Sequence, residues 1–200
     1  MKNKLSLLVA IVLIPLLLAC EKESVRIDNY LVEYATVNVA GSTVTFKLDD
    51  GKILMPETTA DKLDVEDGVR VILNYTPLDE DGFIKVNRIQ RIFMDVIKEE
   101  GFPDELKTSP IKIVTIWVSG QYLNMSFEVD YHSKPHITGL YRDMEADEPT
   151  LYFSYSREED PPGAPTLTYL SFDLNSLESD TPFIVYVNTY EGMRKFEFSL

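Results

Sequence analysis

The chain is short of the residues on which most catalytic and metal sites depend. Its 200 residues include one cysteine, two histidines and one tryptophan. A single cysteine excludes an internal disulfide, and Pro135 between His132 and His136 excludes the helical spacing of an H-E-x-x-H zinc motif. No serine lies in a G-x-S-x-G turn. The sequence therefore predicts no catalytic residue, no metal site and no cofactor.

Positive charge is also scarce. The chain has 19 Lys and Arg residues against 33 Asp and Glu residues, a formal net charge of −14. Such a chain is repelled by nucleic acid and by anionic head groups, so we expect no nucleic-acid partner. Solubility alone is the simpler explanation of the charge.

The one long apolar run is too short to cross a bilayer. Residues 5–19 carry no charge and follow the basic start Met1-Lys2-Asn3-Lys4, but a transmembrane helix needs roughly 20 apolar residues. A basic start, an apolar stretch of this length and a small residue before the cut are typical of a secretory signal peptide. We therefore assign residues 1–19 to a signal peptide and exclude them from the fold.

The only cysteine stands where this signal ends. Leu17-Leu18-Ala19-Cys20 resembles a bacterial lipobox, in which the cysteine becomes the first residue and is acylated, commonly with palmitate. Two or more acyl chains anchor a protein stably to a membrane. The sequence therefore predicts a lipoprotein of the bacterial cell envelope that is anchored through lipid on Cys20. We expect it in the outer membrane, facing the periplasm or the cell surface. A secreted protein with a chance cysteine is the alternative.

No stretch of the remaining chain has a long helical period, whereas alternation of apolar and polar residues recurs throughout. This alternation is typical of β-strands. We expect two domains, 20–95 and 110–200, joined by a linker at 96–109 that contains Gly101 and Pro103.

The first domain is predicted to be a small barrel of the OB type. Its strands alternate around the turns at 49–52 and 77–82, and residues 56–63 are the one place for a helical turn. Five short strands with this insert suit an OB-like barrel, and a bare five-stranded sandwich is the alternative.

The second domain is predicted to be an immunoglobulin-like β-sandwich without its disulfide. Trp117 is expected to fill its core. Turn residues separate seven expected strands, which are 111–120, 122–132, 136–144, 150–157, 166–174, 183–190 and 193–200.

Several phrases of the second domain resemble those of the NigD-like family of bacterial lipoproteins. They are W-V-S-G-Q-Y-L-N at 117–124, K-P-H-I-T-G-L-Y-R-D at 134–143, L-Y-F-S-Y-S-R-E-E-D at 151–160 and L-S-F-D-L at 170–174. The resemblance covers nearly the whole chain and implies an OB-like N-terminal domain and an all-β C-terminal domain. It implies almost no chemistry.

These phrases also supply a candidate binding surface, because loops at the end of a sandwich are held by the sheets without being buried. The expected function is that of a membrane-anchored, non-enzymatic binding or accessory protein with a protein or glycan partner. A hydrolase of envelope polymers and a bacteriocin-sequestering immunity protein are the alternatives. A third alternative is that the phrases only encode the sandwich, with Asp160 capping a turn. The candidate surface consists of Tyr131, His132, His136, Arg142, Tyr155, Glu158, Glu159 and Asp160.

Overall fold

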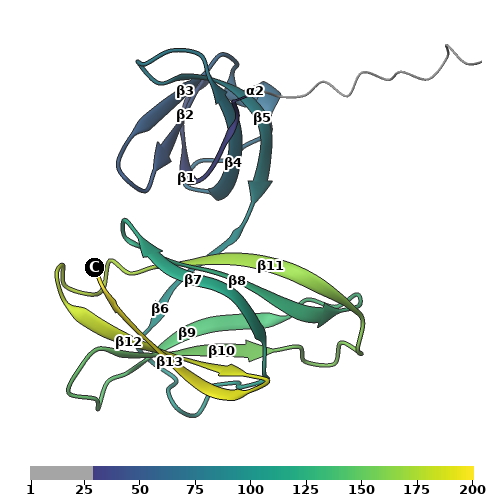
Figure 1. Ribbon diagram of the computed structural model, residues 1–200, viewed down its shortest axis with the longest axis vertical. Coiled ribbons are helices and arrows are strands. Elements are labelled where there is room, and N and C mark those ends of the chain that lie inside the picture. The colour runs from purple at the N-terminus through teal and green to yellow at the C-terminus, as the bar shows by residue number, and fades with distance from the viewer. Residues whose placement is uncertain (1–28) are drawn as a thin grey trace, which may run out of the picture.

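The computed structural model describes residues 29–200 and contains two β domains, one above the other in Figure 1. The predicted cleavage and lipidation at Cys20 lie outside the described residues. The elements are β1 (Leu31–Ala40), β2 (Thr43–Leu48), β3 (Ile53–Pro56), α2 (Ala60–Leu63), β4 (Arg70–Pro77), β5 (Phe83–Arg91), β6 (Phe93–Lys98), β7 (Lys112–Ser119), β8 (Tyr122–Tyr131), β9 (Ile137–Asp143), β10 (Thr150–Ser156), β11 (Ala164–Asp173), β12 (Pro182–Thr189) and β13 (Gly192–Ser199).

The first domain is a closed five-stranded barrel in the order β1-β2-β3-β5-β4, and β3 pairs with β5 in parallel. The single helical turn α2 lies between β3 and β4, within the range that the sequence indicates. Alternate residues of each strand point inward, as the period of two requires. They form a closed core around Phe46, Leu73 and Ile84, each at most 1% exposed. The OB-like prediction is confirmed.

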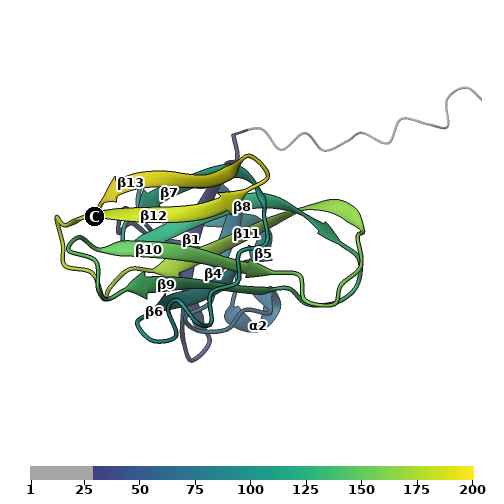
Figure 2. The same ribbon diagram turned by 90° about the horizontal axis from the view of Figure 1, so that it is seen from below.

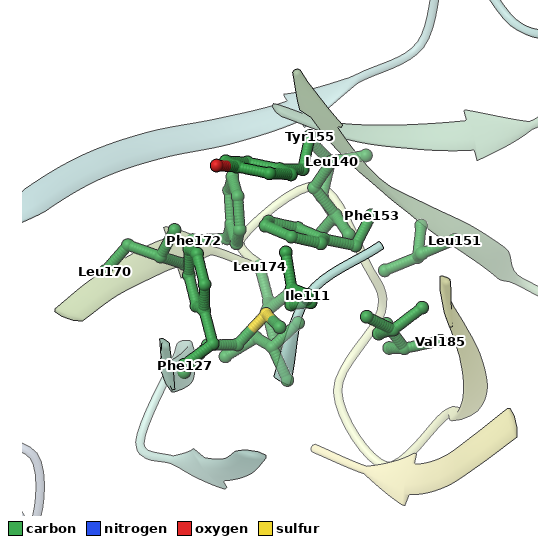
Figure 3. Packing of buried hydrophobic residues seen from close by; sticks show 14 of the residues in the cluster. Ile111, Phe127, Leu140, Leu151, Phe153, Tyr155, Leu170, Phe172, Leu174 and Val185 are labelled. Atoms are coloured by element: carbon green, nitrogen blue, oxygen red, sulfur yellow. The ribbon is translucent and has the colours of Figure 1, made fainter. Parts of the chain in front are cut away.

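The second domain is a sandwich of two sheets that share one strand. The order β13-β12-β10-β9-β6-β11-β8-β7 is continuous because β6 pairs with β11 on one side and with β9 on the other. In Figure 2 the strands β9, β10, β12 and β13 run along one layer and β8 and β11 lie behind them. The inward side chains meet in a large apolar cluster, part of which Figure 3 shows around Phe127, Phe153 and Phe172.

Strand β6 corrects the predicted domain boundary. The expected first domain at 20–95 and the expected linker at 96–109 both include residues of β6, because β5 ends at Arg91 and β6 begins at Phe93. The rest of the expected linker is also bound to the sandwich. The N–H of Ser109 donates to the carbonyl of Tyr155, and the N–H of Tyr155 donates to the carbonyl of Lys107. The connection between the two domains is therefore the single residue Ile92.

The barrel rests against the outer face of the sheet formed by β7, β8 and β11. The tip of the β7–β8 hairpin points up at the barrel in Figure 1. Gly120 in this hairpin has φ +55°, and a Cβ there would lie 2.6 Å from the carbonyl oxygen of Asp49. Glycine is the residue that tolerates both the left-handed conformation and the close approach.

A buried ion pair lies in this domain interface. The Arg70 side chain is fully buried, and its two terminal nitrogens each lie 2.6 Å from a carboxylate oxygen of Asp49. The second domain completes its surroundings: the guanidinium lies over the Tyr122 ring, 3.9 Å from the centroid, and one nitrogen donates to Asn124 at 3.4 Å. Planar stacking and a two-pronged carboxylate contact are both geometries that suit arginine.

Trp117 belongs to the same interface, so its expected place in the sandwich core is wrong. Its ring meets Tyr34 of the barrel edge to face, with centroids 5.1 Å apart. Trp117 pairs with Asn124 across the β7–β8 ladder, while the neighbouring Leu123 and Met125 point into the core. Residues on the outer face of this sheet are covered by the barrel and not by the second sheet.

Candidate functional site

The sandwich is open along one corner. Strand β6 pairs with β11 only at Leu170–Asp173, and with β9 only at Leu140 and Tyr141. In the part of the chain that the structure describes, the neighbouring stretches 137–139 of β9 and 164–169 of β11 therefore have no paired strand on the β6 side, although each pairs fully on its other side. Along these stretches β6 does not join the edge of one sheet, β9, to the edge of the other, β11.

A pocket of about 220 Å³ lies at this corner. Inward-facing side chains of both sheets form its walls, together with Phe93 at the start of β6. Aromatic rings predominate and the polar groups are few, which is the usual composition of a binding pocket. The lining residues are Phe93, Phe127, Val129, Tyr131, His136, Thr138, Tyr155, Thr168 and Leu170.

His136 forms one wall of the pocket and is held at both ring nitrogens. Its Nε2 lies 3.1 Å from a carboxylate oxygen of Asp160, and its Nδ1 lies 2.8 Å from the hydroxyl of Tyr155. An ionised carboxylate only accepts hydrogen bonds, so the Nε2–H of His136 donates to Asp160. The second hydrogen bond joins Nδ1 to the Tyr155 hydroxyl, so both ring nitrogens have a fixed partner.

Asp160 connects this ring to the β8–β9 turn. Its side chain accepts the backbone N–H groups of His132, Ser133 and Lys134 at 2.8, 3.0 and 2.9 Å. Burial alone raises the pKa of the carboxyl, but the three N–H donors and His136 outweigh it and hold the pKa well below the usual range. Asp160 is thus an ionised carboxylate, only 2% exposed, that fixes the turn.

Tyr155 lies between this chain of hydrogen bonds and the core. Figure 3 shows its ring among the apolar side chains of the cluster, with the hydroxyl oxygen at the edge of the cluster. Burial is the main cause that raises the pKa of Tyr155, to about 12. The phenol keeps its proton at neutral pH and is hydrogen-bonded to His136, so it is not a phenolate nucleophile.

The arrangement therefore suits recognition better than a reaction. The rings of Tyr131 and Tyr155 both meet the His136 ring edge to face, with centroids 5.4 and 5.5 Å apart. The rings of His136 and Tyr155 are thus fixed by packing and hydrogen bonds, and the half-exposed Tyr131 packs against His136. Such fixed rings bind a ligand with little loss of side-chain freedom.

The structure brings together most of the predicted surface but not all of it. Tyr131, His136 and Tyr155 line the pocket, and Asp160 lies outside its lining and binds the His136 ring. His132 lies in the turn that Asp160 fixes, and its Nδ1 contacts the Ser133 hydroxyl at 2.9 Å. The structural part of the turn-capping alternative is thus confirmed for Asp160.

The two acidic residues before Asp160 lie in the exposed loop after β10. Glu159 forms an ion pair with Lys134 at 3.1 Å, and both side chains are largely exposed. Glu158 has a left-handed backbone with φ 51°. These residues lie at the rim of the site and not within it.

Arg142 lies at the other end of the sandwich, so including it in this surface is wrong. Thr138 of β9 pairs with Tyr155 near the pocket, whereas Arg142, four residues later, pairs with Leu151. Arg142 contacts Glu99 at 3.7 Å. A strand advances about 3.3 Å per residue, which carries Arg142 away from the opening.

Sequence reasoning missed the apolar walls of the pocket. Phe93 falls in a stretch expected to be a barrel strand, and Phe127 and Leu170 read as ordinary core positions. Thr138 and Thr168 face inward at the open corner, yet threonine is common in any strand. One usable signal for the pocket was present in the sequence: Thr138 and Thr168 are polar residues on the otherwise apolar inner faces of β9 and β11.

Both domains match models of known families. Residues 34–92 match the NigD-like N-terminal OB domain, and residues 94–200 match the NigD-like C-terminal beta sandwich domain. The chain belongs to the NigD-like family. The matches meet at Ile92 and Phe93, the junction that the strand pairing places between the two domains of this NigD-like protein.

Solved structures with this architecture come from species of Parabacteroides and Bacteroides. One, described as a toxin-related protein from Parabacteroides distasonis, is 28% identical with a TM-score of 0.76, and the match covers 85% of this chain and 92% of the other. A NigD-like immunity protein from Bacteroides caccae is 18% identical with a TM-score of 0.63, over 84% and 96% of the two chains. A protein from Bacteroides fragilis described as a lipoprotein is 11% identical with a TM-score of 0.64, over 86% and 98%. The last two likenesses show the fold alone.

Other comparisons add little. A search of curated proteins gave no match. Within residues 29–200 no helix is long and apolar enough to cross a membrane. In the same residues no three His, Cys, Asp or Glu side chains are grouped as metal ligands would be.

Proposed function

We propose that the protein is a non-enzymatic binding protein of the bacterial cell envelope, and that it recognises its partner at the open corner of the second domain. The observation that carries the proposal is the pocket walled by Tyr131, His136 and Tyr155. It is concave, largely apolar and built from side chains of both sheets. These are the features of a recognition site with few, fixed polar groups.

The chemistry of the site supports binding over hydrolysis of an envelope polymer. A glycoside hydrolase needs a carboxylic acid that keeps its proton until it reaches the leaving group. The carboxyl of Asp160 has its pKa held below the usual range and already accepts three backbone N–H groups. It has neither the proton nor the free access that such an acid requires.

Sequestration of a toxic partner is a more specific form of the same function. Relatives of this fold are described as toxin-related and as a NigD-like immunity protein. A protein that binds a toxin needs a rigid recognition site and no reaction. The pocket and its hydrogen-bonded walls meet that requirement.

Anchoring through Cys20 is the second part of the proposal. The lipobox-like Leu17-Leu18-Ala19-Cys20 supports it, and a relative of this fold from Bacteroides fragilis is described as a lipoprotein. Mass spectrometry of the N-terminal peptide tests it. Acyl chains on Cys20 are expected, and a mature terminus at another residue without lipid would overturn the assignment.

A matched pair of variants tests the binding site. Thr138→Phe places a ring in the pocket, and Thr181→Phe makes the same change near the opposite end of the sandwich. The full tagged chain is solubilised with membranes in mild detergent, and co-purifying molecules are compared with wild type. We expect the partner to be lost with Thr138→Phe and kept with Thr181→Phe. Equal capture by the two variants would contradict the proposed site.

A further inference from the structure

The open corner presents strand edges as well as a pocket. Among residues 29–200, no strand neighbours residues 137–139 of β9 or 164–169 of β11 on the side that faces the opening. An unpaired edge offers its N–H and C=O groups to another chain. Natural sheets commonly cover such edges or protect them with charge or proline; the side chains here are uncharged, and Pro165 is the one residue of the two stretches without an N–H to donate.

Exposed apolar side chains surround the same opening. Phe93 is 51% exposed and Tyr131 is 41% exposed. They come from two different strands, β6 and β8, and both line the pocket. Grouped apolar exposure beside a pocket marks an interaction surface more strongly than scattered residues do.

Charge indicates which partner this surface would attract. Residues 93–200 contain 19 Asp and Glu residues against 8 Lys and Arg residues, a net charge of −11, whereas residues 29–92 have 11 against 7. In the loop after β10, Glu158 takes part in no ion pair of residues 29–200, and Glu159 engages Lys134. The second domain therefore attracts cationic partners and repels anionic ones.

We infer that the partner is a protein that contributes an extended, basic segment with a bulky apolar residue. The segment pairs along the free edge of β9 or β11, its apolar side chain enters the pocket against Phe93, Phe127 and Tyr131, and its basic residues face Glu158 in the loop after β10. Strand addition of this kind draws affinity from main-chain hydrogen bonds and specificity from side-chain pockets. The inference rests on the proposed function and adds the chemical class of the partner.

A displayed library of random linear 12-residue peptides tests the inference on the purified chain 29–200. Selection is carried out in parallel against wild type, Tyr131→Ala, Thr138→Phe and Thr181→Phe. We expect wild type and Thr181→Phe to enrich the same peptides, with Lys or Arg flanking one Phe, Leu, Ile or Trp. At least a tenfold loss of binding is expected for the two pocket variants. Thermal melting curves check that each variant is folded, and Tyr131→Ala changes a half-exposed side chain.

A synthetic peptide from the selection then tests the strand pairing. Methylating its backbone nitrogens removes the donors that a β ladder needs, so binding should fall at least tenfold. Amide exchange at 137–139 or 164–169 should slow in the complex with the unmodified peptide. Equal binding of the methylated peptide, enrichment of acidic peptides, or no enrichment over Thr138→Phe would each overturn the inference. If the membrane partner is still lost with Thr138→Phe, the proposed function stands while this inference fails.

Discussion

Two buried charges determine much of the structure at the scale of single residues, and they are stabilised differently. Asp160 is surrounded by N–H donors from one turn and by His136, so it is held within one domain. Arg70 is paired with Asp49 of its own domain but covered by Tyr122 and Asn124 of the other. A buried charge that loses its partner is costly, so each position should be sensitive to substitution.

Arg70→Met should destabilise the protein by about 3–5 kcal/mol, because Asp49 is left buried without its partner. Arg91→Met is the matched control, since its ion pair with Glu66 is exposed, and it should cost under about 1 kcal/mol. Urea unfolding of both variants provides the measurement. The double change Arg70→Met with Asp49→Leu should recover part of the loss, and equal effects of Arg70→Met and Arg91→Met would contradict this account.

Asp160 should make stability depend on pH in the acidic range. Its pKa is lowered in the folded state from an ordinary 3.8, so its contribution is complete above that value and is lost as the pH falls further. The difference in Tm between wild type and Asp160→Asn should therefore be constant from pH 5 upward and shrink below about pH 4.

Glu159→Gln is the control for this titration, because Glu159 lies in the same loop with a largely exposed side chain. It should leave the profile close to that of wild type. A Tm difference for Asp160→Asn that grows on acidification would show that the sign is wrong.

The sequence alone predicted the structural role of some of these residues and not of others. Asp160 could be singled out because it ends an acidic run beside a turn, and its capping role is the one that the structure shows. Trp117 and Arg70 could not be placed, because alternation indicates which face of a strand a residue occupies but not what covers that face. The barrel covers the outer face of β8, so Asn124 and Ser126 are buried although they are polar.

At the scale of elements, β6 has the largest effect on the sandwich. It pairs with β9 and β11 and thereby joins the two sheets, and its Ile97 belongs to the core. Where β6 leaves β9, the corner opens and the pocket begins. One strand therefore both closes the sandwich and leaves the opening that we assign to binding.

A fragment that begins at residue 93 should fold, whereas one that begins at 110 should not. The shorter fragment lacks β6, so it exposes the edges of β9 and β11 along their whole length and loses Ile97 from the core. Near-UV circular dichroism and thermal melting distinguish the two outcomes. A cooperative transition in the fragment 110–200 would show that β6 is dispensable.

The strands themselves were largely predictable, and their grouping into domains was less so. Alternating residues located the strands of both domains, together with the turn before β3 and the helical turn α2. The charged stretch that contains β6 breaks the alternation, because Phe93, Met94 and Val96 are exposed while Asp95 is half-buried. Its pairing comes from partners at 140–141 and 170–173, which are remote in sequence.

At the scale of the whole molecule, the two domains are held in one relative position. The connection is only Ile92, whose N–H donates to the carbonyl of Arg70. The contact between Tyr34 and Trp117 and the covered Arg70 add specific packing on either side of this joint. The open corner of the sandwich is thereby held in a fixed orientation relative to the barrel.

Brief trypsin digestion of residues 29–200 should leave the junction intact, because Arg91 is paired with Val71 in the β4–β5 ladder and Lys107 is bonded to β10. Arg70→Met should accelerate cleavage after Arg91, since it loosens the interface, while cleavage after Lys62 on α2 stays unchanged. Mass spectrometry of the first fragments identifies the sites of cleavage. Rapid cleavage of the wild-type chain within 91–109 would show a flexible linker.

Photo-crosslinking in cells that make the full chain tests the central claim, partner recognition at the open corner, most directly. A photo-reactive amino acid replaces Tyr131 at the pocket, Met193 on β13 or Leu78 on the barrel, all of them exposed positions. We predict an adduct of defined mass from position 131 that disappears with Thr138→Phe and persists with Thr181→Phe. Adducts from position 78 or 193 but none from 131 would contradict the account.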